Sequence, residues 1–522
     1  MSPAAPRVAV IGGGLAGITA AIALAEAGAA VTLLEARPRL GGATCSFSRD
    51  GLTVDTGQHI FLGCCTAYRD LLGKLGMSEH APIQDRFDVS VLAPGAIPRR
   101  GRLRRTALPG PLHMLPALGR YPFLSLSERT SVARPALAMR FVDPARPGVD
   151  EQRFGDWLAA RGQSERARRA LWDLFTVSAL NIAGDDASLS LAAIVVKTGL
   201  LGKKNAADIG VPALPLGELH GDAGAALLTG LGAQVLLNAK VSAIEPGAVE
   251  PGNGQEARFR VRLARAEDDA ALPAEIPADA VVLAVPHEAA ARLIPPGALP
   301  DATVAGWAGL GASPIVNVHV IYDRPVMDQP FAAAIDSPVQ WVFDRTRISG
   351  LDRHAPGGAA SRPQYLAISL SAADEYVDVP AAALREQFIP ALAELFPAAR
   401  EAQVTEFFVT RERRATFRQA PGTARLRPTA ATNLPGLVLA GAWTATGWPD
   451  TMESAVRSGL AAAIELRRTV LSVPGHSPSG HPSSGHPGAG HSASGHPSAG
   501  HSDSVLSGSE ANATTSTIGE RQ

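Results

Sequence analysis

The sequence predicts an α/β fold organised around a Rossmann-like nucleotide-binding unit at its N-terminus. The first observation is an apolar, mostly β-branched run at residues 8–11, which suits a strand buried on both faces of a parallel sheet. The second is an Ala-rich run at residues 15–27, which favours a helix and is followed by Gly28 as its stop. The third is another buried-type strand at residues 31–34, closed by Glu35. Together these segments form a βαβ unit.

Glycines occupy the first turn of this unit in the spacing Gly-x-Gly-x-x-Gly. Gly12 permits the tight turn, Gly14 lets a pyrophosphate approach the backbone, and Gly17 lets the helix lie close to the strand. Phosphates bind to the N–H groups at the positive end of such a helix. Glu35, 18 residues after Gly17, is placed to accept hydrogen bonds from a ribose 2′-OH. The predicted nucleotide contacts are Gly12, Gly14, Ala16, Gly17, Glu35 and Ala36.

A secretory signal peptide is the alternative explanation, since Arg7 precedes a long and mostly apolar run. Three consecutive glycines interrupt that run, and it continues into a second strand, whereas a signal peptide ends at a cleavage site. We therefore interpret the N-terminus as nucleotide-binding.

Length and composition restrict the remaining possibilities. The 522 residues suffice for two joined domains with sizeable cores. The 48 Lys and Arg nearly balance the 49 Asp and Glu, so no global charge points to nucleic acid. Cys45, Cys64 and Cys65 fit a reducing, cytoplasmic compartment without disulfides, and their spacing is not that of a metal site. We expect no transmembrane helix.

A glycine pair follows the second strand, and short strand patterns at residues 43–47 and 52–55 lead to the sequence Asp-Thr-Gly-Gln-His. This arrangement resembles the FAD-containing amine oxidase and phytoene desaturase superfamily, in which the paired glycines pass close to the cofactor phosphates. Plain NAD-binding Rossmann domains do not need this glycine pair. The resemblance therefore implies FAD as the cofactor and an amine-oxidase type fold. It adds to the expected cofactor contacts Gly41, Gly42, Gly57 and Gln58.

The segment at residues 57–76 is similar, more specifically, to the hydroxysqualene dehydroxylase group, which carries a comparable Gly-Gln-His step with small residues and a Tyr beyond it. The resemblance extends from the N-terminus to about Arg468, with specific motifs at both ends. It implies reduction of hydroxysqualene to squalene, a C30 isoprenoid lipid as the substrate, and association with other enzymes of the squalene and hopanoid pathway.

A basic stretch without acidic residues covers residues 89–127. Arginines interspersed with apolar side chains suit an anionic bilayer surface, where each contributes about 1 kcal/mol. A solvated basic loop is the alternative. Because a C30 lipid cannot diffuse freely through water, we expect peripheral membrane contact through residues 99–141, at the inner face of the cytoplasmic membrane. The arginines are Arg99, Arg100, Arg102, Arg104, Arg105 and Arg120.

The middle of the chain is predicted to be largely helical before it returns to the nucleotide-binding domain. The spacing of large apolar residues predicts a core helix over residues 154–180, and a second apolar helix over residues 188–201. A helix at residues 223–231 and a strand at residues 234–244 follow. In related flavoproteins a Val at this step contacts the adenine side, so the resemblance implies a cofactor contact at Val241.

An apolar strand at residues 280–285 precedes His287, a candidate acid that we interpret as structural, since a loop histidine after a sheet strand usually is. Trp307, Trp341 and Phe343 either line an apolar substrate cavity or belong to the core, and for each alone we favour the core. The expected elements of the second domain are strands at residues 304–322, 332–343, 365–370 and 402–410 and a helix at residues 381–396.

The second diagnostic motif lies at residues 437–463, where a strand meets Gly441 and a helix begins near Asp450 or Thr451. N–H groups at the start of this helix suit the flavin pyrimidine edge, where negative charge accumulates on reduction. The pattern T-G-x-P-x-T-M-E-x-A-x-x-S-G is very similar to the dehydroxylase group. It implies a cofactor contact at Gly441 and at Met452, beside Glu453.

Two positions depart from many relatives. Ala442 replaces an Asp that commonly hydrogen-bonds the flavin chain, and Ala43 replaces an Arg or Lys after the glycine pair. Backbone N–H groups are expected to retain much of the binding.

From Ser472 onward the composition changes to Gly, Ser, Pro, Ala and His, with Gly-His recurring every five residues. Such a segment cannot bury enough apolar surface to order itself, so it is predicted to be disordered. Metal binding by these histidines is the alternative to a low-complexity repeat, and we expect no metal site. The predicted domains are an FAD-binding domain (1–85, 214–300 and 421–470), an interleaved α+β substrate domain (86–213 and 301–420) and the tail (471–522).

The implied chemistry requires a proton donor, since an allylic alcohol ionises when its oxygen is protonated and reduced flavin then supplies hydride. His59 is the candidate because it follows Gly57 beside the expected flavin, and a structural histidine is the alternative. The faces of Trp443 or Trp448 are candidates to stabilise the cation.

Two other functions remain open. An isoprenoid desaturase acts on phytoene or dehydrosqualene in the opposite redox direction, which sequence alone does not distinguish. A non-catalytic lipid-handling protein on the same fold, like the Rab GDP-dissociation inhibitor relatives, is encouraged only by Ala442.

Overall fold

A computed structural model describes residues 5–110, 112–247, 257–264, 272–353 and 362–470. The predicted tail with its histidine repeat lies outside the described residues. All features below belong to the compact unit formed by Met1–Ser472.

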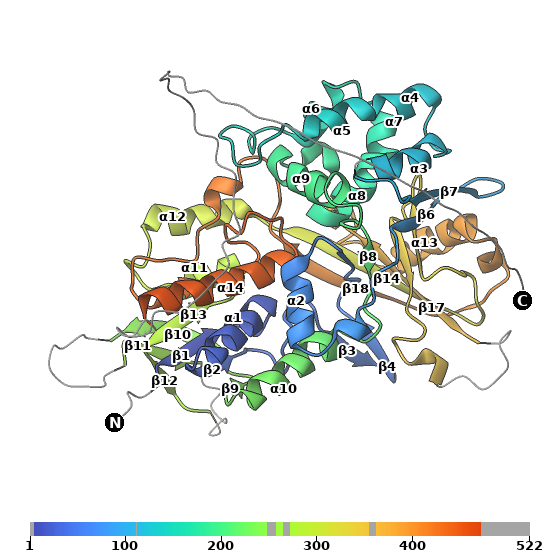
Figure 1. The fold of residues 1–522 in the computed structure, drawn as a ribbon. Coiled ribbons are helices and arrows are strands. Elements are labelled where there is room, and N and C mark those ends of the chain that lie inside the picture. Colours follow the sequence, from blue (N-terminus) through green and yellow to red (C-terminus); the bar gives the residue numbers. More distant parts are fainter. Residues whose placement is uncertain (1–4, 111, 248–256, 265–271, 354–361, 471–522) are drawn as a thin grey trace, which may run out of the picture. The chain divides into compact units, whose positions relative to one another are not determined.

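The first sheet is parallel and contains the two strands predicted at the N-terminus (Figure 1). Val8 and Val10 pack toward helices on one face, whereas Ala9 and Ile11 pack with the core on the other. Both faces are buried, which explains why the strand is apolar at successive positions. In spatial order the strands are β19 (Leu437–Leu439), β13 (Ala280–Leu283), β1 (Arg7–Ile11), β2 (Ala30–Leu34) and β9 (Gln234–Leu236).

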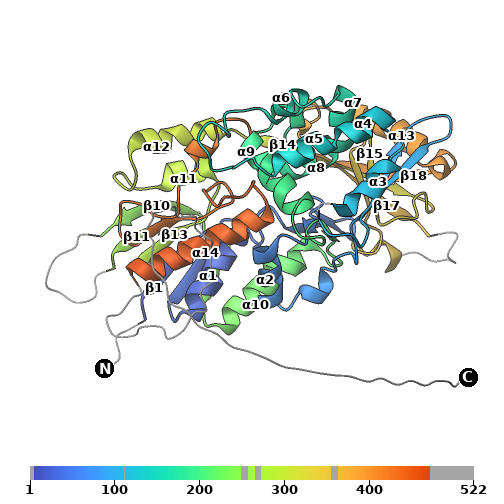
Figure 2. The same cartoon turned by 45° about the horizontal axis from the view of Figure 1, so that its top comes forward.

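Helices α1 (Leu15–Glu26) and α14 (Met452–Thr469) lie side by side over one face of this sheet (Figures 1 and 2). A Cβ atom on Gly459 of α14 would come within 2.3 Å of the Ala16 carbonyl oxygen, so this close approach requires glycine. Helix α10 (Ala223–Gly230) also packs on α1, with Gly224 against Ile18. The opposite face packs on an antiparallel sheet of β10 (Val241–Pro246), β11 (Phe259–Leu263) and β12 (Glu275–Ala278).

The second large sheet has seven strands and is antiparallel except where β15 pairs with β6. Helix α13 (Ala381–Leu395) covers one face through Phe388 and Leu392, which pack with Val318 and Val320. Asn317 lies on the other face of β14. The strands in spatial order are β18 (Val404–Thr416), β14 (Ser313–Tyr322), β17 (Gln364–Leu370), β16 (Trp341–Asp344), β15 (Phe331–Ala334), β6 (Asp88–Ala93) and β7 (Arg99–Arg104).

Helices between residues 115 and 200 form a layer beside this sheet (Figure 1). The prediction of one core helix over residues 154–180 is wrong, because Gly162 adopts a φ of +79° and Ser164 then caps a new helix by accepting the N–H of Ala167. The helix predicted at residues 188–201 is present, and its last turn is a π-helix, η5 (Val196–Leu200). The helices are α3 (Leu115–Gly119), α4 (Leu126–Ser131), α5 (Ala133–Met139), α6 (Phe154–Ala159), α7 (Glu165–Ala167), α8 (Asp173–Leu180) and α9 (Leu189–Val195).

The strands expected at residues 304–322 and 332–343 need correction. Helix α12 (Asp301–Gly306) and the 3-10 turn η7 (Trp307–Leu310) precede β14, which begins only at Ser313. Residues 332–343 belong to β15 and β16, separated by a turn at Asp336 with a φ of +56°. Short apolar runs do not distinguish helix from strand by periodicity, so the boundaries were not readable from the pattern.

Candidate cofactor and active site

The turn between β1 and α1 requires glycine at Gly12 and at Gly17. A Cβ atom on Gly12 would lie 2.2 Å from the Ala284 carbonyl oxygen, and Gly12 has a φ of +107°. A Cβ atom on Gly17 would lie 1.9 Å from the Gly12 carbonyl oxygen. This segment therefore packs tightly between the end of β13 and the start of α1, as the glycine spacing predicts.

The paired glycines fold back onto this turn. The Gly41 N–H donates to the Gly13 carbonyl oxygen at 2.8 Å, and a Cβ atom on Gly42 would meet the Gly14 Cα at 2.9 Å. No side chain caps the start of α1 at Gly14, and its first turn holds no acidic residue. A Cβ atom on Gly14 would have only the Gly42 Cα within 4 Å, at 3.8 Å, so the space above it is open. An open glycine cradle at an uncapped helix start fits a pyrophosphate.

Glu35 is buried at the end of β2, and both of its carboxylate oxygens already accept backbone hydrogen bonds. Oε2 accepts the Gly13 N–H at 2.7 Å and Oε1 accepts the Arg37 N–H at 2.8 Å. The side chain therefore holds the glycine turn in place, and its remaining lone pairs are available to a ribose hydroxyl. The Ala239 N–H donates to the Glu35 carbonyl oxygen, which brings the start of β10 at Val241 to the same end of the sheet, while Ala36 is exposed there.

The Asp-Thr-Gly-Gln-His step follows a hairpin of β3 (Ser46–Arg49) and β4 (Leu52–Asp55). Asp55 forms a buried ion pair with Arg345, which stands at the end of β16. Its Oδ1 accepts the Ser46 hydroxyl at 2.6 Å and the Leu216 N–H at 3.0 Å. These contacts anchor the segment that leads to Gly57.

Gly57 lies between the His59 ring and the Asn317 amide. A Cβ atom on Gly57 would be 3.1 Å from His59 Cε1 and 4.0 Å from Asn317 Nδ2. Asn317 donates to the Thr56 carbonyl oxygen at 3.2 Å, and its Oδ1, like Oε1 of Gln58, is buried without a hydrogen-bond partner among the described residues. Burial lowers the pKa of His59, so its imidazole is neutral at pH 7. The polar groups of His59 and Asn317 thus converge at Gly57.

A fully buried histidine, His220, stands close to the half-buried His59. His220 belongs to the π-helical turn η6 (Gly217–Asp222), which precedes α10. Its Nε2 atom lies 2.7 Å from the Tyr68 hydroxyl. Burial lowers the pKa of His220 to about 3, and the neighbouring His59 adds to that effect. Sequence patterns did not single out His220, because an isolated histidine in a short helical turn carries no recognisable motif.

Glu453 has a role in the fold itself. Its buried carboxylate accepts the N–H groups of Ala67 and Tyr68 at 3.2 and 2.8 Å, and Arg457 donates to it at 2.7 Å. Helix α2 (Thr66–Lys74) has no side-chain cap of its own, so α14 supplies the anion at its N-terminus. Met452, the first residue of α14, is half-buried against the same core.

The loop from Gly441 to the start of α14 is held by its backbone. Gly441, with a φ of +140°, donates its N–H to the Ser458 hydroxyl at 2.8 Å. Arg427 donates to the carbonyl oxygens of Ala442 and Thr444 at 3.0 and 2.6 Å. Burial lowers the pKa of Arg427 to about 10, which leaves it charged at pH 7. The loop shape therefore does not depend on an Asp at position 442.

Trp443 and Trp448, in the loop before α14, already contact other residues of the fold. Trp443 donates its indole N–H to the Val285 carbonyl oxygen at 2.9 Å, and its ring centroid lies 4.8 Å from that of the fully buried Trp307. The Arg457 guanidinium lies 4.8 Å above the Trp448 ring. Trp307 is thus a core residue, whereas Trp341 is half-buried.

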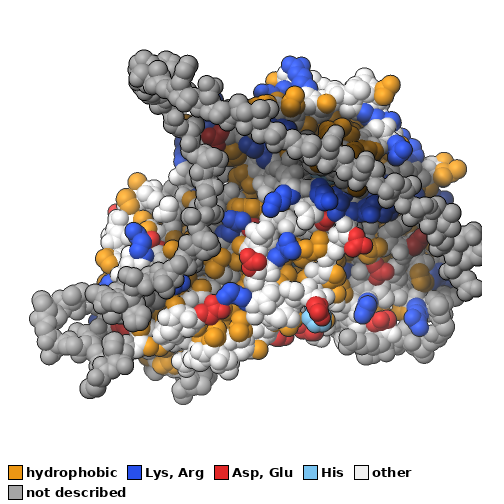
Figure 3. All heavy atoms as spheres, viewed as in Figure 1, with side chains coloured by type: hydrophobic (Ala, Val, Ile, Leu, Met, Phe, Trp, Pro, Cys, Tyr) orange, Lys and Arg blue, Asp and Glu red, His pale blue; other side chains and the backbone are white. Residues whose placement is uncertain are grey.

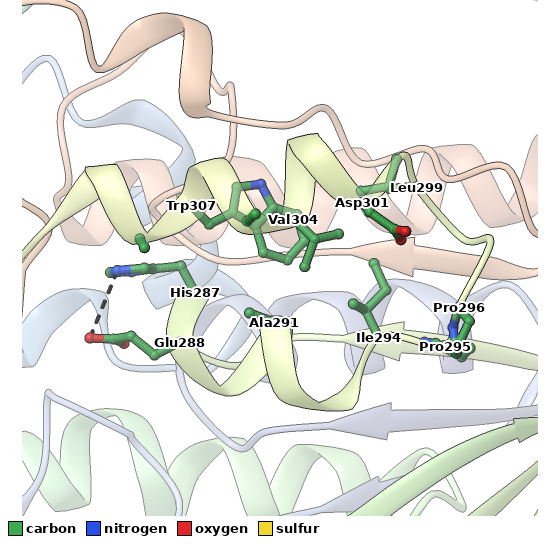
Figure 4. A pocket seen from close by; sticks show the side chains of 12 residues that line it. His287, Glu288, Ala291, Ile294, Pro295, Pro296, Leu299, Asp301, Val304 and Trp307 are labelled. Carbon is green, nitrogen blue, oxygen red and sulfur yellow. Dashed lines mark ion pairs between the residues drawn. The ribbon is translucent and has the colours of Figure 1, made fainter.

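A surface cavity of about 540 Å³ lies between α11 (His287–Leu293) and α12 (Figure 4). His287 lines it and faces Glu288 at 3.8 Å, with Ala291, Ile294 and Val304 along the apolar wall. Burial lowers the pKa of His287, whose ring also lies 6.1 Å from that of Trp443. His287 therefore lines the cavity and also packs toward Trp443.

The described part of the chain holds no cluster of three His, Cys, Asp or Glu side chains suited to a metal ion. No helix within it combines the length and apolar character needed to cross a bilayer.

Most of the chain matches a known protein family. The family described as flavin-containing amine oxidoreductase matches residues 15–466. The hydroxysqualene dehydroxylase of Rhodopseudomonas palustris is 29% identical over 466 residues, which cover 87% of this chain and 97% of that protein. The zeta-carotene desaturase of Arabidopsis thaliana is 24% identical over 495 residues, which cover 88% of this chain and 84% of that protein.

Solved structures agree at the level of the fold. Wild-type putrescine oxidase bound to putrescine has a TM-score of 0.64 and 20% identity, covering 89% of this chain and 99% of that one. Cyclohexylamine oxidase from Brevibacterium oxydans has a TM-score of 0.61 and 19% identity over the same shares.

Proposed function

We propose, from the premise that this chain belongs to the family of flavin-containing amine oxidoreductases, that it reduces hydroxysqualene to squalene with loss of water. The chain is an oxidoreductase and its cofactor is FAD. The observation that carries the specific reaction is the 29% identity to a hydroxysqualene dehydroxylase over nearly the whole of both chains.

We propose that the FAD lies along the residues that the sequence motifs mark. The open cradle at Gly14 and Gly42 suits the pyrophosphate, and Glu35 suits the ribose. The start of α14 at Met452 supplies N–H groups for the flavin pyrimidine edge. The full proposed set is Gly12, Gly14, Ala16, Gly17, Glu35, Ala36, Gly41, Gly42, Gly57, Gln58, Val241, Gly441 and Met452.

When bound by these residues, reduced FAD would supply the hydride that replaces the hydroxyl group. The oxygen leaves as water once it has accepted a proton, so the protein must hold a donor at that oxygen. His59 is the proposed donor: its neutral imidazole would first take up a proton from solvent, and the imidazolium so formed, whose pKa burial lowers, would pass that proton to the oxygen. Asn317 Oδ1 and Gln58 Oε1, buried and without partners among the described residues, are placed to accept hydrogen bonds and orient the hydroxyl or His59.

The direct test is an anaerobic assay of the reduced holoenzyme with hydroxysqualene. The expected result is squalene in an amount equal to the flavin reoxidised. Reduced flavin that persists beside unchanged substrate would contradict the proposal. Purified protein without the visible absorption of flavin would contradict cofactor binding itself.

An isoprenoid desaturase is the second candidate, favoured by the 24% identity to a zeta-carotene desaturase. This enzyme would remove hydrogen from its substrate, so oxidised holoenzyme incubated with phytoene or dehydrosqualene would lose its visible absorption. Reduction of the flavin by these hydrocarbons, together with no reaction of hydroxysqualene, would favour the desaturase.

We also propose peripheral contact with the inner face of the cytoplasmic membrane through residues 99–141. Exposed basic and hydrophobic side chains gather over the upper part of the molecule, where Figure 1 shows α4 and α5 (Figure 3). Acidic residues outside this segment offset part of its charge: Asp88 pairs with Arg102 and Arg104, and Asp208 pairs with the half-buried Arg105.

Four exposed arginines within residues 99–141 form no ion pair with an acidic side chain in the described part of the chain. They are Arg100, Arg120, Arg134 and Arg140. Vesicle flotation tests the contact: replacing these four with Ser is expected to weaken binding to phosphatidylglycerol vesicles. Unchanged flotation would refute it.

A further inference from the structure

A second cavity lies under the surface segment that carries these arginines. It has a volume of about 310 Å³ and lies among α3, α5, α8 and the π-helix η5. Its wall is apolar apart from the exposed Arg140 at its edge. A ligand here would find hydrocarbon and aromatic surface but no buried hydrogen-bonding partner. The lining includes Leu118, Ala136, Trp172, Phe175, Val196 and Leu200.

The rim of the cavity is unusually apolar for a protein surface. Leu112, Leu115 and Leu137 line it, yet 47%, 49% and 59% of their surfaces are exposed. Of nine exposed large hydrophobic side chains in the described residues, seven lie between Ile97 and Phe141. Scattered exposed leucines need no explanation, but a concentration of this kind marks an interaction surface.

The surrounding charge favours an anionic bilayer as the partner surface. Arg134 and Arg140 lie on or directly after α5, beside exposed Leu137, and neither has an acidic partner among the described residues. Arginine guanidinium groups beside apolar side chains match lipid phosphates above acyl chains.

The inner wall of the cavity leads toward the proposed active site. Val196 and Leu200 of η5 line the cavity, whereas a Cβ atom on Gly199 of the same turn would lie 3.6 Å from Leu62 Cδ1. Leu62 belongs to β5 (Phe61–Leu62), three residues after His59. One turn of π-helix therefore separates the cavity from the segment that carries His59, and such turns are frequent at functional sites.

We propose that this cavity is the portal through which the hydrocarbon chain of the lipid substrate leaves an anionic bilayer and reaches the active site. The identity of that substrate rests on the proposed function. The cavity, at about 310 Å³, lies at the small end of the usual range for ligand pockets, about 300–1,000 Å³, so we assign it to one end of the C30 chain and not to the whole molecule.

The test uses the full-length holoenzyme and an Ala136→Phe variant, which fills the cavity without adding an indole. Ala159→Phe, at an exposed position on α6 outside the cavity, is the matched control. Phosphatidylglycerol vesicles with brominated acyl chains are the probe, since bromine quenches tryptophan on contact and Trp172 lines the cavity. A Trp172→Phe variant identifies the part of the quenching that arises there.

The wild type and Ala159→Phe are expected to show the Trp172 quenching, and Ala136→Phe to lose it while still floating with vesicles. With hydroxysqualene in the vesicles, Ala136→Phe is expected to raise KM on the order of tenfold with little change in kcat. Equal quenching and equal KM in the two Phe variants would overturn the portal. An absence of Trp172 quenching in the wild type would also overturn it. If a second copy of the chain covers the cavity, sedimentation would show the dimer that causes this absence.

Failure of the proposed function gives a different result. If none of these proteins converts hydroxysqualene but Trp172 is still quenched in the wild type and not in Ala136→Phe, the chain-binding site stands and the reaction assignment falls. If the wild type converts hydroxysqualene and Ala136→Phe matches it in both assays, the reaction stands and the portal falls.

Discussion

The Glu453 carboxylate accepts the Tyr68 backbone N–H at 2.8 Å, although 385 residues separate the two in the chain. This contact joins the helix that starts at Met452 to the helix that follows the Gly-Gln-His step. Both segments carry proposed cofactor contacts. The carboxylate thus fixes the two ends of the proposed flavin site relative to each other.

Replacing Glu453 with Gln is expected to lower the free energy of unfolding by about 1–3 kcal/mol. A neutral amide loses the favourable interaction with the start of α2 and leaves Arg457 without its ion pair. Thermal or urea unfolding of the holoenzyme measures the loss. Glu165→Gln, which removes an exposed pair with Arg169, is the control and is expected to cost no more than about 0.5 kcal/mol.

Alanine at Gly14 and at Gly17 is expected to have different consequences. The Gly17 Cβ would collide with the Gly12 carbonyl, so Gly17→Ala should fail to fold or lose several kcal/mol of stability. The Gly14 Cβ fits the fold but projects into the open cradle, so Gly14→Ala should fold and bind FAD on the order of tenfold more weakly. Circular dichroism and flavin titration separate the two effects. Normal FAD affinity in Gly14→Ala would place the pyrophosphate elsewhere.

The Asp55 and Arg345 pair is expected to be among the most sensitive positions for stability. Asp55→Asn leaves a buried guanidinium without its counter-ion, which costs about 3–5 kcal/mol. The Asp55→Asn, Arg345→Met double variant should lose clearly less than the sum of the single changes. The matched control is Asp336→Asn, whose pair with Arg166 is partly exposed. A double variant that loses the full sum would show that the two side chains act independently.

His59→Ala is expected to reduce turnover of hydroxysqualene by about 10²- to 10⁴-fold with a normal FAD content, if His59 donates the proton. Single-turnover reoxidation of the reduced flavin measures this directly. His80→Ala, at an exposed position, serves as the control. Near-normal turnover in His59→Ala would assign His59 to structure.

The protein is expected to lose stability as the pH falls below about 6.5, because His220 has a folded-state pKa of about 3 and an unfolded value near 6.5. Protonation then favours the unfolded chain, so the contribution is complete above about pH 6.5 and is lost progressively toward pH 3. Between pH 6.5 and pH 5 this amounts to about 2 kcal/mol for one histidine.

Urea unfolding at several pH values measures that slope. His220→Gln, which keeps a hydrogen-bonding group beside Tyr68, should flatten it, whereas exposed His80→Gln should not. Part of the slope should remain in His220→Gln, because burial also lowers the pKa of His319 to about 3. An unchanged slope in His220→Gln would contradict the assignment.

Local patterns were sufficient where the chemistry is local. The βαβ unit, the glycine turn and the helix after Thr451 follow from residues close together in sequence, and all three are present in the structure. The helix and strand boundaries in the middle of the chain were predicted less well. Gly162 breaks one expected helix, and residues 301–310 are helical where a strand was expected, because a short apolar run suits either state.

The sequence by itself determined the nucleotide-binding unit, because its turn needs glycine at Gly12, where φ is +107°, and at Gly17, where a Cβ atom would meet the Gly12 carbonyl oxygen. Only the tertiary structure revealed Arg345 beside Asp55, Asn317 beside Gly57 and Arg427 beneath the loop at Ala442. These partners come from other strands and loops and belong to no local motif. A buried charge or amide is defined by what packs around it, and that packing exists only when distant segments have come together.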